Sequence, residues 1–210
     1  MSTIRPLPGP EIYEGIESLN LPDDTQGWHS THPIFAQLIE EVKPLNILEV
    51  GSWKGASAIH MANLSPLSMV TCVDTWLGGA DHELNQQVKT SVLPREHGYP
   101  RMYFQFLHNV AKAGLQKRIR PIPQTSLNGA RLLKAHAYTA QLCYIDGSHE
   151  YSDVYADLDA YWPLVETGGI LFGDDFGFTG VMAATFRFLT ERDLWSRVKV
   201  VENNFWVIRK

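Results

Sequence analysis

Short apolar runs alternate with longer stretches whose apolar residues recur at helical spacing. The runs predict strands at 47–50, 68–74, 119–122, 140–145 and 168–173. The periodic stretches predict helices at about 33–42, 55–62, 103–113, 127–135, 151–164 and 178–192. Strands and helices in strict alternation are typical of an α/β fold with a parallel sheet.

Two more apolar runs lie near the end of the sequence. They predict strands at 198–201 and 205–208, and Glu202-Asn-Asn204 between them is a hairpin signal. We therefore expect a Rossmann-like, doubly wound sheet of seven strands. It would be mostly parallel, with a C-terminal antiparallel hairpin and helices on both faces.

The first thirty or so residues lack a sustained period. Ser2 to about Gly27 mixes prolines and glycines with short apolar patches, and only 11–19 could form a turn of helix. We therefore divide the chain into an irregular N-terminal arm, residues 1–30, and one domain, residues 31–210.

The end of the arm leads into the first helix. Ser30 or Thr31 is the expected cap of that helix, because a side-chain oxygen at this position satisfies a free backbone N–H. Trp28 and His29 come just before it. We interpret them as an aromatic cover on the helix start rather than as active-site residues.

A long polar segment interrupts the pattern between Trp76 and Pro100. Loops of this length in a compact domain are usually functional, so we expect a lid-like insertion at about 76–100 that encloses the substrate. Its histidines, among them His82 and His97, are interpreted as surface or structural groups.

Composition narrows the class of protein. At 210 residues with 44% hydrophobic content, the chain can bury the core of a single domain. A net charge of −5 and the lack of a basic run argue against a nucleic-acid partner. No apolar run approaches the roughly 18 residues of a membrane span, and the first residues lack a signal peptide's apolar core, so we expect a cytoplasmic protein.

Two cysteines complete this picture. Cys72 and Cys143 each fall in a predicted strand, and a third strand would separate them. At about 4.8 Å per strand spacing, their Cα atoms would be too far apart for a disulfide. We expect two core thiols.

The most informative stretch is the first strand and the turn after it. Glu49 lies in the strand, and Gly51-Ser-Trp-Lys-Gly55 leads into a helix. Gly51 would allow a sharp turn, and Gly55 would let a ligand or the strand approach the helix start, because neither residue has a Cβ. The helix offers its free N–H groups to this crevice. With two glycines in place of G-x-G-x-x-G, the turn does not match a dinucleotide site.

Two later residues belong to the same expected pocket. Asp74 ends the second strand, where a carboxylate can accept hydrogen bonds from ribose hydroxyls. Ser126 could cap its helix or touch an adenine ring, and capping is the favoured single role.

Acidic side chains follow two other predicted strands. Asp146-Gly-Ser-His149 follows one strand and Asp174-Asp175 follows the next. If these strands are neighbours, the three carboxylates converge where open α/β sheets bind ligands. A divalent cation would relieve their repulsion, and oxygen donors favour a hard ion such as Mg²⁺, Ca²⁺ or Mn²⁺. Helix-capping aspartates without a metal are the alternative.

Several stretches carry a family resemblance. The E-x-G-x-x-x-G turn resembles the first motif of class I S-adenosylmethionine-dependent methyltransferases. The runs VDTWLGG, QFLHNVAKAGLQKRIRPIPQTS and YIDGSHEYSDVYADLDAYWPLVETGGILFGDDF look like the metal-dependent macrocin and mycinamicin sugar O-methyltransferases and the related cephalosporin-biosynthesis family. The resemblance covers roughly Ile47 to Phe176. The 76–100 segment matches no acceptor site of these families, so the substrate does not carry over.

This resemblance implies a function and a set of site residues. It implies an S-adenosylmethionine- and Mg²⁺-dependent O-methyltransferase of a small hydroxylated acceptor, such as a sugar or glycosylated metabolite. Asp146, Asp174 and Asp175 would hold the metal, and His149 or Asp146 would be the base. The expected cofactor-binding residues are Glu49, Gly51, Ser52, Gly55, Ser57, Asp74, Thr75, Ser126 and Asp146.

Other functions fit parts of the same pattern. A non-catalytic S-adenosylmethionine-binding protein would keep the pocket for regulation or assembly, but the full aspartate and histidine set argues against it. A nicotinamide oxidoreductase would share the sheet, but the third glycine is missing. Apolar surface on the arm or the long segment could serve a homo-oligomer contact. Fold analogy alone does not choose among these functions.

Overall fold

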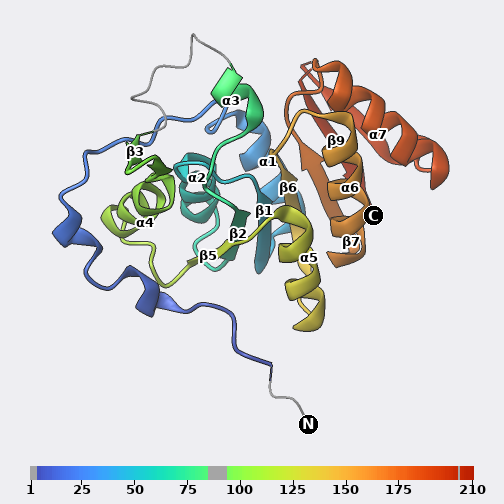
Figure 1. The fold of residues 1–210 in the computed structure, drawn as a ribbon. Helices are drawn as coiled ribbons and strands as arrows, with labels where there is room; N and C mark the ends of the chain where they lie inside the picture. The colour runs from blue at the N-terminus through green and yellow to red at the C-terminus, as the bar shows by residue number, and fades with distance from the viewer. Residues whose placement is uncertain (1–3, 85–93, 203) are drawn as a thin grey trace.

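A central sheet organises the chain, as seen in the computed structural model, which describes residues 4–84, 94–202 and 204–210 (Figure 1). The sheet has seven strands in the order β5-β2-β1-β6-β7-β9-β8. The strands are β1 (Asn46–Val50), β2 (Met69–Asp74), β5 (Ile119–Pro123), β6 (Ala140–Ile145), β7 (Val165–Gly173), β8 (Val198–Val201) and β9 (Phe205–Arg209). The predicted doubly wound sheet is confirmed.

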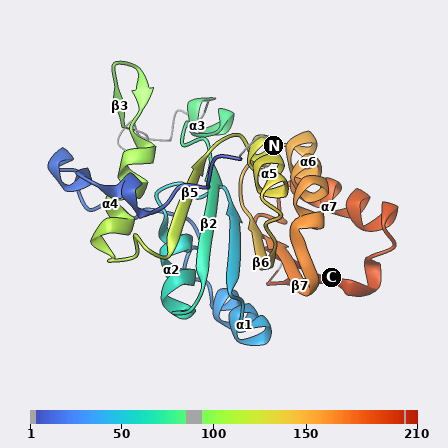
Figure 2. The same cartoon turned by 90° about the horizontal axis from the view of Figure 1, so that it is seen from below.

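Helices cover both faces of the sheet, as the second view shows (Figure 2). One group of helices packs on one face and the other group packs on the opposite face. β1, β2 and β7 contribute side chains to both layers. The first group is α1 (Pro33–Val42), α2 (Ala56–Leu64) and α4 (Met102–Lys112). The second group is α5 (Ser126–Ala135), α6 (Tyr151–Tyr161) and α7 (Thr179–Glu191).

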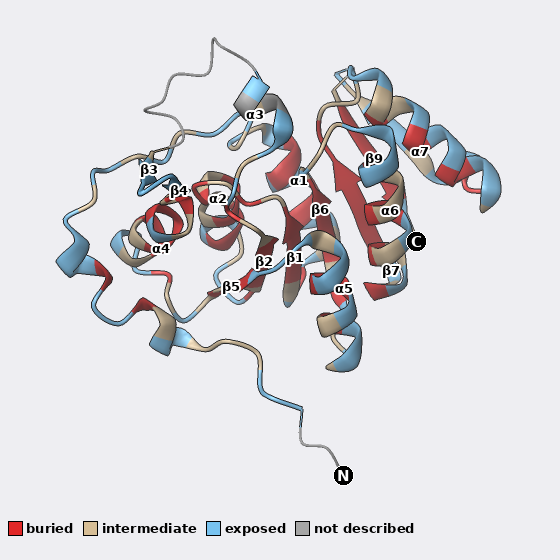
Figure 3. Ribbon diagram, viewed as in Figure 1, coloured by how far each residue is buried: buried red, intermediate tan, exposed pale blue. Residues whose placement is uncertain are grey.

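Neighbouring residues of each central strand face opposite layers. In β1, Ile47 belongs to the α1 layer and Leu48 to the α5 layer, and both are fully buried. Burial on both faces explains why these strands are nearly continuous apolar runs in the sequence. Figure 3 shows the buried sheet between half-exposed helices. The polar residues that end the strands therefore lie at one edge of a rigid core.

The last two strands differ in direction from the parallel part. β9 pairs antiparallel with β7 on one side and with β8 on the other, as the predicted C-terminal hairpin requires. Residue 203 of the predicted turn lies outside the described residues. Both cysteines are buried and free, and β1 separates their strands, as expected.

Some element ends differ from the sequence prediction. The helical region at 151–164 is divided into α6 and a 3-10 turn, η3 (Trp162–Leu164), at Pro163, which has no N–H to continue the helix. The cap of α1 is neither Ser30 nor Thr31. It is His32, whose Nδ1 accepts a hydrogen bond from the Ile34 N–H at 3.2 Å.

The arm contains two short 3-10 turns and runs along the molecule. η1 (Pro10–Tyr13) and η2 (Ile16–Leu19) both contact α4. The Tyr13 hydroxyl donates to the carbonyl of Ile119 in β5 at 2.8 Å, and Tyr13 is buried. The arm is irregular, as predicted, but it contributes to the hydrophobic core.

Part of the predicted lid has regular structure. It contains α3 (Ala80–Leu84) and a small hairpin of β3 (Arg95–Glu96) and β4 (Tyr99–Pro100). Residues 85–93, the centre of that segment, lie outside the described residues, so the lid itself stays a prediction. No helix among the described residues has the length and apolar character needed to cross a membrane.

Candidate functional site

The glycine turn after β1 is held by backbone contacts on two sides. The Gly51 N–H donates to Val73 in β2 at 2.9 Å, and the Asp146 N–H donates to Val50 at 2.8 Å. Gly51 has φ +85°, and a Cβ there would lie 1.9 Å from the Asp146 carbonyl oxygen. The predicted sharp turn is confirmed, and the close approach to the next strand explains why glycine stands here.

Gly55 has a related role at the start of α2. It is the N-cap residue and has φ +86°. A Cβ at Gly55 would lie 3.0 Å from the Phe106 ring, so the group that approaches the helix start is a side chain of α4. The strand is therefore not the group that approaches Gly55, and the predicted approach of a ligand there stays a prediction.

The carboxylate inside β1 is fully buried beneath this turn. Ser57 donates a hydrogen bond to Glu49 Oε1, whereas Glu49 Oε2 has no partner among the described residues. Burial raises the pKa of Glu49 to about 7. The Ser52 hydroxyl beside it is also buried; it lies close enough to favour the charged carboxylate, but it forms no hydrogen bond of good geometry with the described residues. Two unsatisfied polar atoms at one turn indicate a place for a polar ligand.

The carboxylate that ends β2 binds backbone groups of its neighbours. Asp74 Oδ2 accepts from the N–H groups of Ser52 and Trp53 at 2.8 and 2.9 Å. Its Oδ1 accepts from Trp76 N–H at 2.7 Å. Burial raises the pKa of Asp74, although these backbone donors oppose the shift. Asp74 thus fixes the glycine turn, and its predicted role toward a ribose stays a prediction.

Two hydroxyls of the predicted pocket have local partners. The hydroxyl of Thr75 accepts from the Leu77 N–H at 3.2 Å. Ser126 does not cap α5, because the side chain of Thr125 accepts from Asn128 N–H instead. Ser126 is the first residue of the helix and donates to Asp157. The favoured capping role of Ser126 is therefore wrong.

The predicted convergence of aspartates occurs at the ends of β6 and β7. These strands are neighbours, and Ile145 pairs with Gly173, so Asp146 and Asp174 follow in register. The Tyr144 hydroxyl donates to Asp146 Oδ2 at 2.9 Å. The Asp175 N–H donates to Asp174 Oδ1 at 2.7 Å.

The carboxylates influence one another electrostatically. Burial, followed by the charges of Asp174 and Asp175, raises the pKa of Asp146 to about 8. Burial also raises the pKa of Asp174; the hydrogen bond from the Asp175 N–H opposes this shift, and the charge of Asp175 adds to it. Excess negative charge at one sheet edge would be relieved by a cation.

His149 lies beside this group. Its Nε2 is 2.8 Å from Asp175 Oδ2, and its ring stacks on Phe178 with centroids 4.5 Å apart. The loop that carries it packs closely on the start of α7, where a Cβ at Gly180 would lie 2.2 Å from the His149 carbonyl oxygen. Asp146, His149 and Asp175 have potential ligand atoms within 4.8 Å of one another.

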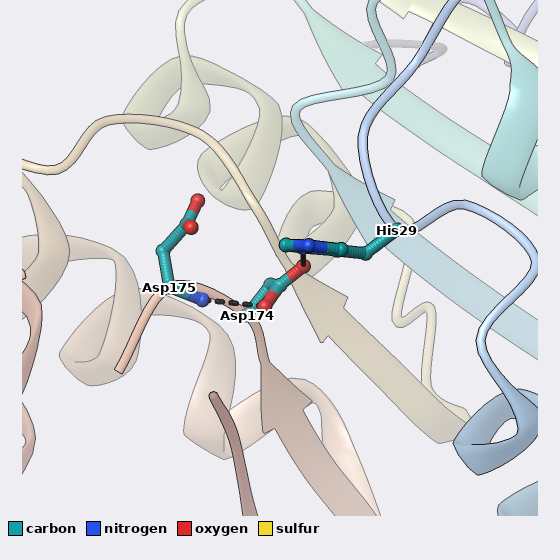
Figure 4. Close-up of side chains that lie close together, drawn as sticks. All are labelled: His29, Asp174 and Asp175. Atoms are coloured by element: carbon teal, nitrogen blue, oxygen red, sulfur yellow. Dashed lines mark hydrogen bonds and ion pairs between the residues drawn. The ribbon is translucent and has the colours of Figure 1, made fainter. Parts of the chain in front are cut away.

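A second histidine joins the cluster from the arm. His29 Nδ1 lies 3.0 Å from Asp174 Oδ2, and Figure 4 shows the ring reaching Asp174 from the arm. His29, Asp174 and Asp175 also have potential ligand atoms within 4.8 Å of one another. The interpretation of His29 as part of a cover on α1 is wrong. Its position depends on the path of an irregular arm, which leaves no periodic signal in the sequence.

Trp28 is also part of the site rather than of a helix cover. Its ring lies 5.6 Å from that of Trp53 in the glycine turn and 5.9 Å from that of His82 in α3. Trp53 and His82 stack with centroids 4.6 Å apart. These three rings, here called the aromatic trio, connect the arm, the glycine turn and the long segment.

A protein-family profile described as a methyltransferase domain matches residues 48–176. This range contains the glycine turn, Asp74, Asp146 and both aspartates after β7. Trp28 and His29 lie outside it. No curated protein sequence matches the chain.

Solved structures share the fold at low sequence identity. The O-methyltransferase NovP is 15% identical, with a TM-score of 0.61 over 84% of this chain and 78% of its own. An O-methyltransferase from Bacillus cereus in complex with SAH is 18% identical, with a TM-score of 0.57 over 95% and 89%. The SAH-bound Podospora anserina methyltransferase PaMTH1 is 15% identical, with a TM-score of 0.59 over 95% and 86%.

Proposed function

The chain belongs to the methyltransferase-domain family that residues 48–176 match, and on that premise we propose that it is a metal-dependent O-methyltransferase. It is an S-adenosylmethionine-dependent enzyme of class I. The proposal adds three points: the methyl group goes to an oxygen, a hard divalent cation such as Mg²⁺ assists, and the acceptor is a small hydroxylated molecule.

One contact carries the proposal. Gly51 of the glycine turn touches the Asp146–Gly147 backbone, where a Cβ would overlap both residues. The turn expected to hold the methyl donor therefore adjoins the first of the three aspartates. A methyl donor on the turn and an oxygen nucleophile at the aspartates would be neighbours, as direct transfer between them requires.

The residues of the turn fit S-adenosylmethionine. Its amino acid portion carries an ammonium group, and Glu49 has one carboxylate oxygen without a partner among the described residues. The unpartnered Ser52 hydroxyl offers a second polar contact. A pyrophosphate would meet the Glu49 carboxylate unfavourably, which argues against a nicotinamide dinucleotide.

The aspartate cluster fits a divalent cation. Asp146 and Asp175 belong to one group of potential ligand atoms, and Asp174 and Asp175 belong to another, so Asp175 is common to both. Carboxylate oxygens suit hard ions. Asp146, Asp174 and Asp175 are therefore the residues that would hold the metal.

The proposed chemistry needs an acceptor hydroxyl that loses its proton. A bound divalent cation would lower the pKa of such a hydroxyl. His149 would accept the proton, since its Nε2 is 2.8 Å from Asp175 Oδ2, which orients the ring. Asp146 is the alternative base, because a carboxylate beside the acceptor oxygen could also take up the proton.

We further propose that the acceptor is a sugar or a glycosylated metabolite. The support is the resemblance of the D-G-S-H and D-D motifs to sugar O-methyltransferases.

Methyl transfer from labelled S-adenosylmethionine to a panel of sugars, glycosides and catechols, with amines and thiols as further acceptors, tests the proposal. We expect transfer that EDTA abolishes and that Mg²⁺ or Mn²⁺ restores. Asp175→Asn should lose activity yet bind S-adenosylhomocysteine, whereas Asp159→Asn, at a surface ion pair with Arg192, should retain both. Transfer that is unaffected by EDTA would exclude the metal's role, and transfer to nitrogen or sulfur acceptors alone would exclude O-methylation.

A further inference from the structure

His29 is placed at the aspartate cluster by an unusual backbone. It has φ +49°, in the left-handed region that non-glycine residues seldom adopt. Trp28 on one side packs on Trp53, and His32 on the other caps α1. The chain is therefore fixed on both sides of His29, and its backbone conformation directs the ring toward Asp174.

The separation of the two side chains matches neighbouring ligands of one ion. Ligand atoms at about 2.1 Å from an octahedral ion lie roughly 3.0 Å apart when they are adjacent. His29 Nδ1 and Asp174 Oδ2 are 3.0 Å apart.

The surroundings of Asp174 direct only one of its oxygens toward His29. Oδ1 accepts hydrogen bonds from the Asp175 N–H and from the side chain of Asn204, whereas Oδ2 faces the His29 ring. Asp174 itself is 4% exposed, so its carboxylate is fixed. The His29 ring also contacts Phe205 edge-on, with centroids 6.3 Å apart.

We propose that His29 is a nitrogen ligand of the metal held by Asp174 and Asp175. This inference rests on the proposed metal dependence and adds a donor from outside the matched domain. Imidazole nitrogen binds first-row transition ions better than it binds Mg²⁺. The site therefore prefers Mn²⁺ or Co²⁺ over Mg²⁺, and His29 accounts for that preference.

The test compares two histidine-to-asparagine variants in protein without a histidine tag. His29→Asn removes the nitrogen donor and keeps a residue that tolerates a positive φ. His97→Asn is the matched control, because His97 also has φ +49° and is exposed in the β3–β4 turn. Mn²⁺ binding is followed by electron paramagnetic resonance, and Mg²⁺ competes for the site. The visible spectrum of bound Co²⁺ reports the donor atoms.

We expect His29→Asn to lower the ratio of Mn²⁺ to Mg²⁺ affinity by about tenfold or more, because an oxygen donor replaces the nitrogen. The Co²⁺ absorption bands should shift in the same variant. His97→Asn should leave the ratio and the bands unchanged. The ratio is insensitive to a general loss of folded protein, since both ions require the same fold.

The outcomes separate this inference from the proposed function. If the wild-type protein binds Mn²⁺ and His29→Asn has the same ratio and Co²⁺ spectrum, His29 is not a ligand, although metal dependence stands. An equal loss of affinity for both ions with an unchanged spectrum would also overturn the inference, since His29 would then only position Asp174. If the wild-type protein binds neither ion, the metal dependence itself is overturned.

Discussion

Gly51 and Asp146 are so close that no side chain fits between them: a Cβ on Gly51 would lie 1.9 Å from the Asp146 carbonyl oxygen. This contact joins the glycine turn of β1 to the start of the aspartate cluster at β6. Movement of either segment would displace the other. The expected donor site and the expected acceptor site are thereby set at a fixed distance.

Gly51→Ala should destabilise the protein by more than about 2 kcal/mol, because a positive φ costs about 1–2 kcal/mol and the overlap with Asp146 adds to it. Gly15→Ala is the control, since Gly15 has φ +75° but no atom within 4 Å of the added Cβ. Urea unfolding of the two variants measures the difference. Equal losses would show that the close approach has no energetic consequence.

Asp24→Asn should release the arm from the glycine turn. Lys54 is 1% exposed, and its Nζ lies 2.6 Å from Asp24 Oδ2. Removing one partner of a buried pair costs about 3–5 kcal/mol, and less here because Asp24 is 29% exposed. Asp23→Asn should leave stability nearly unchanged, because the Asp23–Lys112 pair is exposed and screened by solvent. Urea unfolding and limited proteolysis of the arm would measure both, and identical behaviour would contradict the prediction.

Glu49 should make stability depend on pH. Its pKa is about 7 in the folded protein and 4.5 in the unfolded chain, so the folded state keeps a proton that the unfolded state has lost. This stability is present below pH 4.5 and is lost as the pH rises to about 7. The change is up to about 3 kcal/mol.

Glu49→Gln should therefore flatten the decline in stability between pH 5 and about 7.5, as measured by urea unfolding without ligand. The other buried carboxylates leave a residual slope, because burial also raises the pKa of Asp146 and Asp157. Glu40→Gln, at an exposed position, is the control and should retain the full slope. A slope equal to that of the wild type in Glu49→Gln would contradict the buried carboxylate's role.

His149→Gln should lower kcat by about 10²–10⁴ if His149 is the base, because general-base catalysis is worth about that factor. S-adenosylhomocysteine affinity, measured by calorimetry, should stay unchanged, since the glycine turn is intact. His108→Gln is a suitable control, because His108 lies on α4 and pairs with Asp23 of the arm. Wild-type kcat in the His149 variant would assign the base to Asp146 instead.

The sequence predicted the sheet and most of the site because both depend on local pattern. The apolar runs predicted β1, β2, β6 and β7. Because β6 and β7 are neighbours in the sheet, the aspartates that follow them lie close together. That Thr125 rather than Ser126 caps α5 was not predictable, because both are good capping residues one position apart.

The contribution of the arm could not be predicted. The contacts of Trp28 and His29 depend on a path without regular secondary structure, fixed by pairs such as Asp24–Lys54 and Gln26–Trp53. These pairs join residues that lie far apart in the sequence and share no period. Only the structure brings the arm to the aspartates.

The position of β9 has a consequence for the order of folding. β8 contacts the sheet through β9, which lies between it and β7. The two strands are close in sequence, so we expect the hairpin to form early and to join β7 as a unit. Asn204, which donates to Asp174, lies at the tip of that hairpin. Hairpin docking would then be the step that completes the aspartate cluster, and a slow docking step would delay activity after the rest of the sheet has formed.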